Sequence, residues 1–195
     1  MPRTQSKSKE KQRKILDAAR RVFCRKGFLA VTMQDIIDEC GISRGGIYLY
    51  YASVDEVFLD VMRQRNADGI STINKSVDAR EPFWQVYDAY VAKQKERLLR
   101  FEHSLFRAYC EYIFSKPKAA VHAFRDTQLM HLRGSVEAIL HLGERQGELD
   151  GGSVPQLAVH FIAVIDGLSV LALGDALTQD VLDAQFDILR RIISK

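Results

Sequence analysis

Apolar residues recur every three or four positions along most of this chain, which is the spacing of an amphipathic α-helix. Gly27 follows the first such stretch, at a place where a glycine often ends a helix. Every segment long enough to judge has this period rather than the alternation of a strand. The pattern predicts an all-helical chain, whose first clear helix contains Ile15, Ala18, Ala19, Val22 and Phe23.

Prolines mark where several later helices begin. Pro82, Pro117 and Pro155 each stand at a plausible first turn, where the missing amide hydrogen costs nothing. The glycine-rich residues 147–153 form the clearest loop. Together these signals predict helices at about residues 53–70, 82–100, 102–115, 117–146, 154–174 and 178–193.

The segment between residues 32 and 51 has the pattern of two short helices joined by a tight turn. Thr32 precedes a helix with a carboxylate in its first turn, and Gly41 ends that helix. Ser43 then caps a further helix after a very short turn. This arrangement fits a helix-turn-helix, whose second helix can lie in the major groove of DNA.

The second of these helices has two different sides. At roughly 100° per residue, Ile47 and Tyr51 fall on one side and would pack on the preceding helices. The opposite arc carries Arg44, Gly45, Tyr48 and Leu49.

Several of these groups suit contact with DNA. Arg44 can reach two acceptors on a guanine edge, or a phosphate, and the hydroxyls of Tyr48 and Tyr50 suit phosphate oxygens. Ser43 and Thr32 begin helices, where free amides favour a phosphate. Plain capping is the alternative role of Ser43 and Thr32, and it is compatible with DNA binding. Core packing is the alternative role of Tyr48 and Tyr50.

Charge is unevenly distributed along the chain. Residues 1–51 hold 11 Lys and Arg against 5 Asp and Glu, a net charge of +6, whereas the remaining residues hold 17 against 20. A basic N-terminal region indicates either a polyanionic partner or a solvated basic tail.

Residues 15–19, 23–28, 32–36 and 40–51 resemble the corresponding motifs of the TetR family of bacterial transcriptional regulators, and the resemblance covers about residues 10–62. It implies an N-terminal basic arm and a three-helix DNA-binding domain over residues 1–52. Residues 53–195 would then form a six-helix domain for ligand binding and dimerisation. The recognition helix would be Ser43 to Tyr50. The candidate DNA-facing positions are Thr32, Gln34, Ser43, Arg44, Gly45, Gly46, Tyr48, Leu49 and Tyr50.

Two positions depart from the family pattern. Gly46 stands where the family often has threonine, and Val54 stands where a lysine is common. Each departure removes a phosphate contact. A basic arm is expected to compensate, formed by Lys7, Lys9, Lys11, Arg13 and Lys14.

The resemblance places the dimer contact on the last two helices. The first of them is apolar on more than one side, so it must be deeply buried, and a two-fold contact between identical chains is self-complementary. The candidate interface residues are Leu157, Phe161, Val164, Leu168, Leu171, Phe186, Leu189 and Ile193.

A small organic effector is the expected ligand, because aromatic side chains crowd the helices that would line its pocket. Ordinary core packing is the alternative for each of them, and Asp166 is either a paired core carboxylate or a group that binds the ligand. The candidate ligand-binding residues are Trp84, Tyr87, Phe106, Tyr109, Cys110, Phe124, Phe161 and Asp166.

Other classes of protein fit the sequence poorly. It has no catalytic, cofactor or metal-binding motif, so we expect neither catalysis nor a cofactor. The apolar stretch 157–173 contains Asp166 and is short for a membrane span. Three scattered cysteines indicate the reducing cytoplasm. The prediction is a homodimeric regulator, most simply a repressor, that binds a palindromic double-stranded operator and is released by its effector.

Two alternatives stay open. One is a helical sensor whose basic region contacts another protein, and the other is a DNA-compacting protein without sequence preference.

Overall fold

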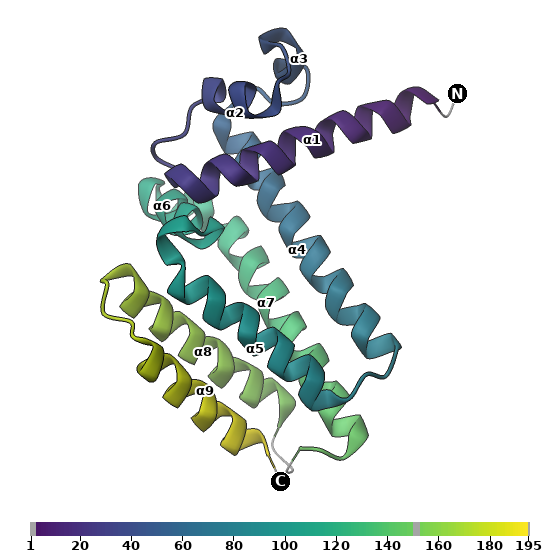
Figure 1. Cartoon of the computed structure of the whole chain (residues 1–195), viewed down its shortest axis with the longest axis vertical. Coiled ribbons are helices and arrows are strands. Elements are labelled where there is room, and N and C mark those ends of the chain that lie inside the picture. The colour runs from purple at the N-terminus through teal and green to yellow at the C-terminus, as the bar shows by residue number, and fades with distance from the viewer. Residues whose placement is uncertain (1–2, 150–152, 195) are drawn as a thin grey trace. The chain divides into compact units, whose positions relative to one another are not determined.

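The computed structural model describes residues 3–149 and 153–194, with side chains from Ser8 onward, and all its regular elements are helices (Figure 1). One isolated bridge pairs Leu149 with Ser194. The helices are α1 (Arg3–Lys26), α2 (Met33–Cys40), α3 (Arg44–Tyr48), α4 (Val54–Asp78), α5 (Phe83–Leu99), the 3-10 turn η1 (Phe101–His103), α6 (Leu105–Ser115), α7 (Lys118–Gln146), α8 (Val154–Leu173) and α9 (Gln179–Ile193). The all-helical prediction is therefore confirmed.

Two helices are longer than their patterns predicted. α1 begins at Arg3, so the backbone of the expected basic arm is part of this helix. α4 continues eight residues past its predicted end at residue 70, because Ile70, Ile73 and Val77 keep the apolar spacing. Arg80, with φ of 52°, follows the end of α4.

The chain divides into two compact units. The N-terminal unit contains the described residues up to Arg65 together with Glu102–Val121. Aromatic rings form the centre of its core, where Phe58 lies 5.0 Å from both Phe23 and Tyr112, centroid to centroid. This compact unit takes in α6 and the first turns of α4, so it extends beyond residue 52. The functional boundary between residues 52 and 53 stays a prediction.

The C-terminal unit contains Asn66–Phe101 and the described residues from His122 onward. Within it α8 and α9 lie side by side and both contact α5 (Figure 1). The guanidinium of Arg190 lies 4.2 Å from the ring centroid of Trp84 and also pairs with Asp88.

Among the described helices, α8 has the length and composition that could cross a membrane. Phe161, Ile165 and Leu168 on one side of α8 are buried within the chain. Asp166 is exposed, so the first of its two expected roles, a paired core carboxylate, is wrong. Its role in ligand binding stays a prediction. Its surroundings still desolvate it enough to raise the pKa of Asp166, an effect that nearby Arg97 partly offsets. A core helix of a water-soluble protein can have the same length and apolar composition as α8.

Candidate nucleic-acid interface

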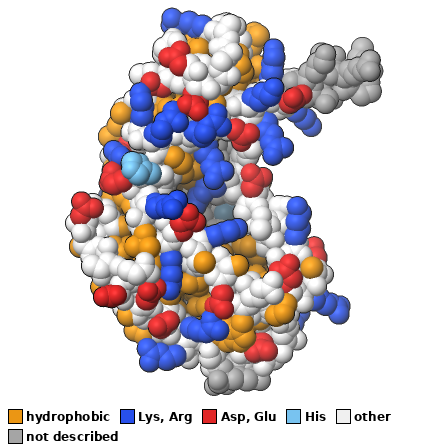
Figure 2. Space-filling model, viewed as in Figure 1, with side chains coloured by type: hydrophobic (Ala, Val, Ile, Leu, Met, Phe, Trp, Pro, Cys, Tyr) orange, Lys and Arg blue, Asp and Glu red, His pale blue; other side chains and the backbone are white. Residues whose placement is uncertain are grey.

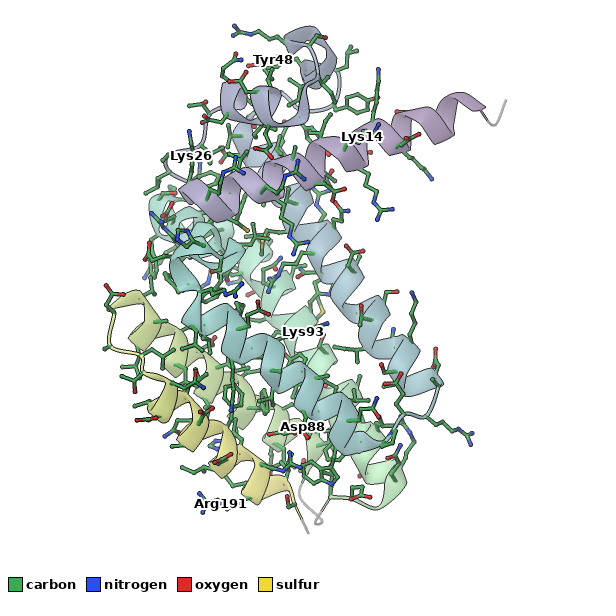
Figure 3. The ribbon with its side chains drawn as sticks, in the orientation of Figure 1. Lys14, Lys26, Tyr48, Asp88, Lys93 and Arg191 are labelled. Atoms are coloured by element: carbon green, nitrogen blue, oxygen red, sulfur yellow. The ribbon has the colours of Figure 1, made fainter. Side chains whose placement is uncertain are left out.

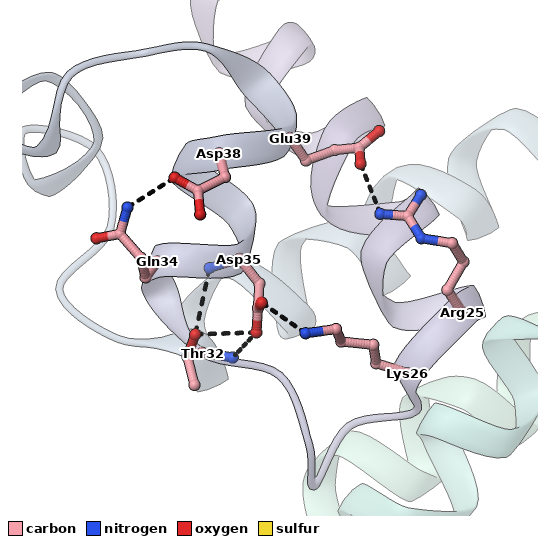
Figure 4. Close-up of polar contacts among 7 residues, drawn as sticks. All are labelled: Arg25, Lys26, Thr32, Gln34, Asp35, Asp38 and Glu39. Atoms are coloured by element: carbon pink, nitrogen blue, oxygen red, sulfur yellow. Dashed lines mark hydrogen bonds and ion pairs between the residues drawn. The ribbon is translucent and has the colours of Figure 1, made fainter.

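α2 is fixed at both ends by local chemistry. The Asp35 N–H donates to Thr32 Oγ1 over 3.2 Å, and the Thr32 N–H donates back to Asp35 Oδ2 over 2.9 Å (Figure 4). These reciprocal bonds form a capping box. Gly41, with φ of 66°, ends the helix in the left-handed conformation that glycine adopts without strain. Both predicted helix boundaries are confirmed.

α3 begins where the sequence predicted and ends earlier. Ser43 Oγ accepts a hydrogen bond of 3.2 Å from the Gly46 N–H, so Ser43 is the cap. The helix ends at Tyr48, and Leu49 and Tyr50 form a turn whose Tyr50 N–H donates to the Ile47 carbonyl over 2.9 Å. The recognition segment is therefore one short helix followed by a turn.

The recognition segment is anchored by Ile47 of α3 and by Tyr51, which follows the turn, and these residues are 0% and 5% exposed. The Tyr51 hydroxyl donates to Asp60 Oδ2 over 2.6 Å, and Gln12 Nε2 donates to both groups over 3.1 Å. Burial, reinforced by the Asp60 carboxylate, raises the pKa of Tyr51, so this hydroxyl keeps its proton and remains a donor. The anchor joins the end of the recognition segment to α1 and α4.

The outer side of α3 is open to solvent, as the helix geometry predicted. Ser43, Arg44 and Gly45 are exposed, Tyr48 is 43% exposed and Leu49 is 85% exposed. The Arg44 guanidinium lies 5.9 Å from the centroid of the Tyr48 ring. We call these five residues the exposed face of α3, and Figure 3 shows Tyr48 on it. That this face binds DNA stays a prediction.

Thr32, Gln34 and Tyr50 already have partners within the chain. The Thr32 hydroxyl donates to Asp35 Oδ2 over 2.9 Å, and Gln34 Nε2 donates to Asp38 Oδ1 over 2.7 Å (Figure 4). The Tyr50 hydroxyl lies 3.4 Å from Ser8 Oγ of α1. Each would have to share or exchange these bonds to contact a phosphate. Thr32 is confirmed as a helix cap, and contact of the three residues with DNA stays a prediction.

Gly45 and Gly46 stand in different surroundings although they are neighbours. A Cβ built on Gly45 meets nothing within 4 Å. A Cβ on Gly46 would lie 2.8 Å from Ile42 Cγ2 and 3.1 Å from Ser43 Oγ. The space that a threonine side chain would need at this position is therefore occupied by Ile42.

We expect Gly46→Ala to lower the free energy of unfolding by about 1–3 kcal/mol relative to Gly45→Ala. Both variants gain the same helix propensity, so their difference isolates the crowding at position 46. Urea denaturation followed by circular dichroism measures it. Equal stability of the two variants would contradict the packing around α3.

Ion pairs neutralise part of the basic N-terminal region. Glu39 accepts from Arg21 Nε at 2.7 Å and from Arg25 Nη2 at 2.6 Å, and Asp35 accepts from Lys26 Nζ at 2.6 Å. The summed charge of the sequence did not anticipate these pairings. Lys and Arg side chains also gather along α1 (Figure 2), and the exposed ones near its start are Lys9, Lys11, Arg13 and Lys14. The side chain of Lys7 lies outside those described.

The pairing of Asp35 makes the stability of α2 depend on pH. The hydrogen bond from Lys26, followed by that from the Thr32 N–H, lowers the pKa of Asp35 from 3.8 to about 2. A lowered folded-state pKa contributes stability above pH 4 that is lost as the pH falls toward 2. We expect Asp35→Asn and Lys26→Gln each to flatten the decline of the urea midpoint between pH 5 and pH 2. Curves parallel to wild type would contradict this role.

The predicted effector residues fall into separate groups. In the C-terminal unit Tyr87 lies 5.6 Å from Trp84 and 6.1 Å from Phe161, between ring centroids. The Tyr87 hydroxyl is buried without a hydrogen-bond partner among the described residues, and burial raises its pKa. Trp84 donates Nε1 to Glu148 over 3.0 Å. The members in the N-terminal unit are Phe106, Tyr109 and Cys110, whereas Phe124 belongs to the C-terminal unit.

A cavity of about 250 Å³ lies between α4 and α7 in the C-terminal unit. The aromatic pattern of the sequence does not predict this cavity, because aliphatic, small and polar side chains line it. The available signal was the pair Gly134 and Ser135, small residues inside a long helix. The lining residues are Ile70, Ile73, Asn74, Met130, His131, Gly134, Ser135 and Ala138.

The predicted dimer residues belong mainly to the core of one chain. Phe161, Leu168, Phe186, Leu189 and Ile193 are each at most 4% exposed, because the inner sides of α8 and α9 pack within the C-terminal unit. Leu157 and Val164 are half-buried, and Leu171 is 39% exposed. The apolar side chains that these helices leave exposed are Val159, Val170, Leu171, Leu173, Val181, Ile188 and Ile192. We call this set the outer face of α8 and α9.

No metal site was found in the part of the chain that the structure describes, since no three His, Cys, Asp or Glu side chains there form a suitable group. Burial raises the pKa of the Cys24 thiol, which opposes formation of a reactive thiolate.

Comparisons with known proteins agree with this geometry. A family model described as "Bacterial regulatory proteins, tetR family" matches residues 15–61, which include α2 and α3. The chain is 26% identical over 208 aligned positions to ArpR of Pseudomonas putida, a probable HTH-type transcriptional regulator, with 96% of the chain and 95% of ArpR covered. It is 34% identical over 113 residues to YfiR of Bacillus subtilis strain 168, an uncharacterized HTH-type transcriptional regulator. That match covers 57% of the chain and 55% of YfiR, so it spans only about half of that relative's length.

A solved structure of a TetR-family transcriptional regulator from Agrobacterium tumefaciens has the same fold. The TM-score is 0.71 at 20% sequence identity, over 96% of this chain and 99% of that one. This likeness supports the all-helical architecture with an N-terminal helix-turn-helix.

Proposed function

Because the chain belongs to the TetR family of bacterial transcriptional regulators, we propose that it is a cytoplasmic, ligand-responsive repressor that binds a palindromic operator as a homodimer. The observation that carries this proposal is the exposed face of α3. It combines a guanidinium, a phenol and two small residues on a segment whose other side is anchored to α1 and α4. Leu49, at 85% exposure, adds an apolar side chain to this face.

Affinity and sequence choice come from different groups in this proposal. Exposed lysines and arginines of α1 neutralise phosphates, which releases counterions and makes binding fall steeply with salt. Arg44 reads a base edge, and Tyr48 contacts a phosphate that fixes the register. Leu49 supplies an apolar surface suited to a thymine methyl group.

The outer face of α8 and α9 supports a homodimer. In the single chain its aliphatic side chains contact solvent; Val170, for example, is 67% exposed and Ile192 is 46% exposed. A second copy related by a two-fold axis would cover the same face on both chains. Two copies of α3 would then bind two half-sites in opposite orientation, which explains a palindrome.

An organic effector would act by favouring one conformation of the dimer. The cavity between α4 and α7 and the buried hydroxyl of Tyr87 are two places in the C-terminal unit where such a molecule can find apolar walls and a polar group. A ligand that fits only the conformation unable to bind DNA shifts the population away from the operator.

Fluorescence anisotropy with a random-sequence duplex over a salt series tests DNA binding as such. We expect weak binding that falls as salt rises. Absence of binding even at low salt would favour the alternative of a sensor that contacts another protein. Equal affinity for random and selected duplexes would instead indicate compaction without sequence preference.

A further inference from the structure

The carboxylate of Glu111, on α6, closes on the turn that follows α1. Glu111 Oε2 accepts hydrogen bonds from the Phe28 N–H over 2.7 Å and from the Leu29 N–H over 2.9 Å. Its other oxygen accepts from Arg107 Nε over 2.8 Å. The side chain is 19% exposed, so these bonds are largely shielded from water.

Gly27 makes this approach possible in two ways. Its backbone φ of 76° is one that residues with a Cβ rarely adopt. A Cβ on Gly27 would also lie only 2.4 Å from both carboxylate oxygens of Glu111. The carboxylate therefore occupies the space that any other residue at position 27 would need.

The placement is electrostatically unusual. A helix ends in unpaired carbonyl groups that carry partial negative charge, and they disfavour a carboxylate nearby. The two amide donors beyond the end of α1, together with Arg107, offset this repulsion. Glu111 thus makes a specific clamp of the turn and is poorly explained as an incidental surface contact.

The clamped turn leads directly into α2. Only Ala30 and Val31 separate Leu29 from the Thr32 cap. The ion pair between Lys26 and Asp35 links the two sides of this turn. Displacement of the turn must therefore move α2, and α3 follows α2 after a single tight connection.

We propose that Glu111 is a positioning residue that holds the helix-turn-helix in register with α6, through the bonds of its carboxylate to the turn before α2. The role rests on the proposed DNA-binding function. It belongs wholly to the N-terminal unit, since that unit contains both α6 and the turn.

Glu111→Ala tests the clamp against a matched control, Glu102→Ala. Glu102 pairs with the same arginine, at Arg107 Nη1 over 2.9 Å, and is 61% exposed. We expect the Phe28 and Leu29 amides to exchange with solvent at least about tenfold faster in Glu111→Ala. Glu111→Gln, which keeps an acceptor, should be intermediate, and Glu102→Ala should match wild type. Unchanged exchange of both amides in Glu111→Ala would overturn the clamp.

Duplex affinity then tests the positioning role, measured at a temperature where circular dichroism shows every variant folded. We expect Glu111→Ala to bind a selected duplex about tenfold more weakly than wild type and Glu102→Ala, with an unchanged salt slope because no phosphate contact is lost. Equal affinities, with the amide exchange accelerated, would overturn the positioning role while leaving DNA binding intact. Failure of wild type to bind any duplex would instead remove the proposed function, and the positioning role with it.

A double-mutant cycle with Gly27→Ala checks the geometry independently. The backbone strain of a Cβ at φ of 76° is the same in both backgrounds, whereas the 2.4 Å contact exists only with Glu111 present. Gly27→Ala should therefore reduce duplex affinity at least about fivefold more in wild type than in Glu111→Ala. Equal reductions would contradict a direct contact between the two positions.

Discussion

Replacing Arg44 with alanine is expected to remove discrimination at one base pair of each half-site, at a cost of about 1–3 kcal/mol for the preferred base. Arg44 is exposed, and its guanidinium lies 5.9 Å from the Tyr48 ring centroid, within the range of a cation–π contact. An exposed guanidinium can donate two parallel hydrogen bonds to a guanine edge. An alanine provides neither the charge nor the donors.

Competition titrations with single-base variants of a selected duplex measure this effect. Arg13→Ala is the matched control, because it removes the same charge from an exposed position on α1 outside the exposed face of α3. The control should weaken binding to every duplex alike and reduce the salt slope by about one unit. If Arg44→Ala also weakens every duplex equally, Arg44 contacts a phosphate and does not read a base.

Introducing a carboxylate on the outer face of α8 and α9 is expected to separate the dimer. Val170→Asp and Ile188→Asp replace side chains that are 67% and 40% exposed in the single chain. Because the interface is two-fold, each substitution places two unpaired carboxylates in it. We therefore expect the free energy of dimerisation to become less favourable by about several kcal/mol. We expect the dimer dissociation constant to rise at least about 100-fold, with a similar loss of operator affinity.

Sedimentation velocity over a concentration series measures the dimer directly. Leu99→Asp is the control, because Leu99 is also exposed, at 46%, but lies at the end of α5. It should leave the sedimentation coefficient unchanged. Wild-type sedimentation as a monomer at micromolar concentration, or dimeric Val170→Asp and Ile188→Asp, would show that this face is not the interface.

The sequence was sufficient to predict α2 and the beginning of α3, because their boundaries depend on local chemistry. Thr32, Gly41 and Ser43 act on atoms within a few residues of themselves. The buried and exposed sides of α3 were predictable for the same reason, since a turn of about 100° per residue places Ile47 nearly opposite Gly45.

Features that depend on tertiary packing were harder to predict. α8 is apolar nearly all round, so periodicity cannot show that Phe161 and Leu168 pack inward while Val159 and Val170 stay exposed. The core role that was one of two expected for Asp166 rested on its apolar sequence neighbours, which do not show that its side chain is exposed.

The clamp at Glu111 joins positions more than 80 residues apart. No local pattern marks either end of such a contact, because a glutamate on an amphipathic helix is ordinary and Gly27 is already explained as a helix terminator. The cavity between α4 and α7 escaped prediction for a similar reason, since its walls come from helices far apart in the chain.

The most direct test of whether the exposed face of α3 reads DNA is selection of bound duplexes from a random pool. The enriched duplex and a scrambled copy are then titrated by fluorescence anisotropy at about 0.15 M salt, close to physiological ionic strength. We predict enrichment of a palindrome that binds at least about 1,000-fold more tightly than its scrambled copy. Recovery of no shared sequence, or equal affinity for an enriched duplex and its scrambled copy, would contradict the account.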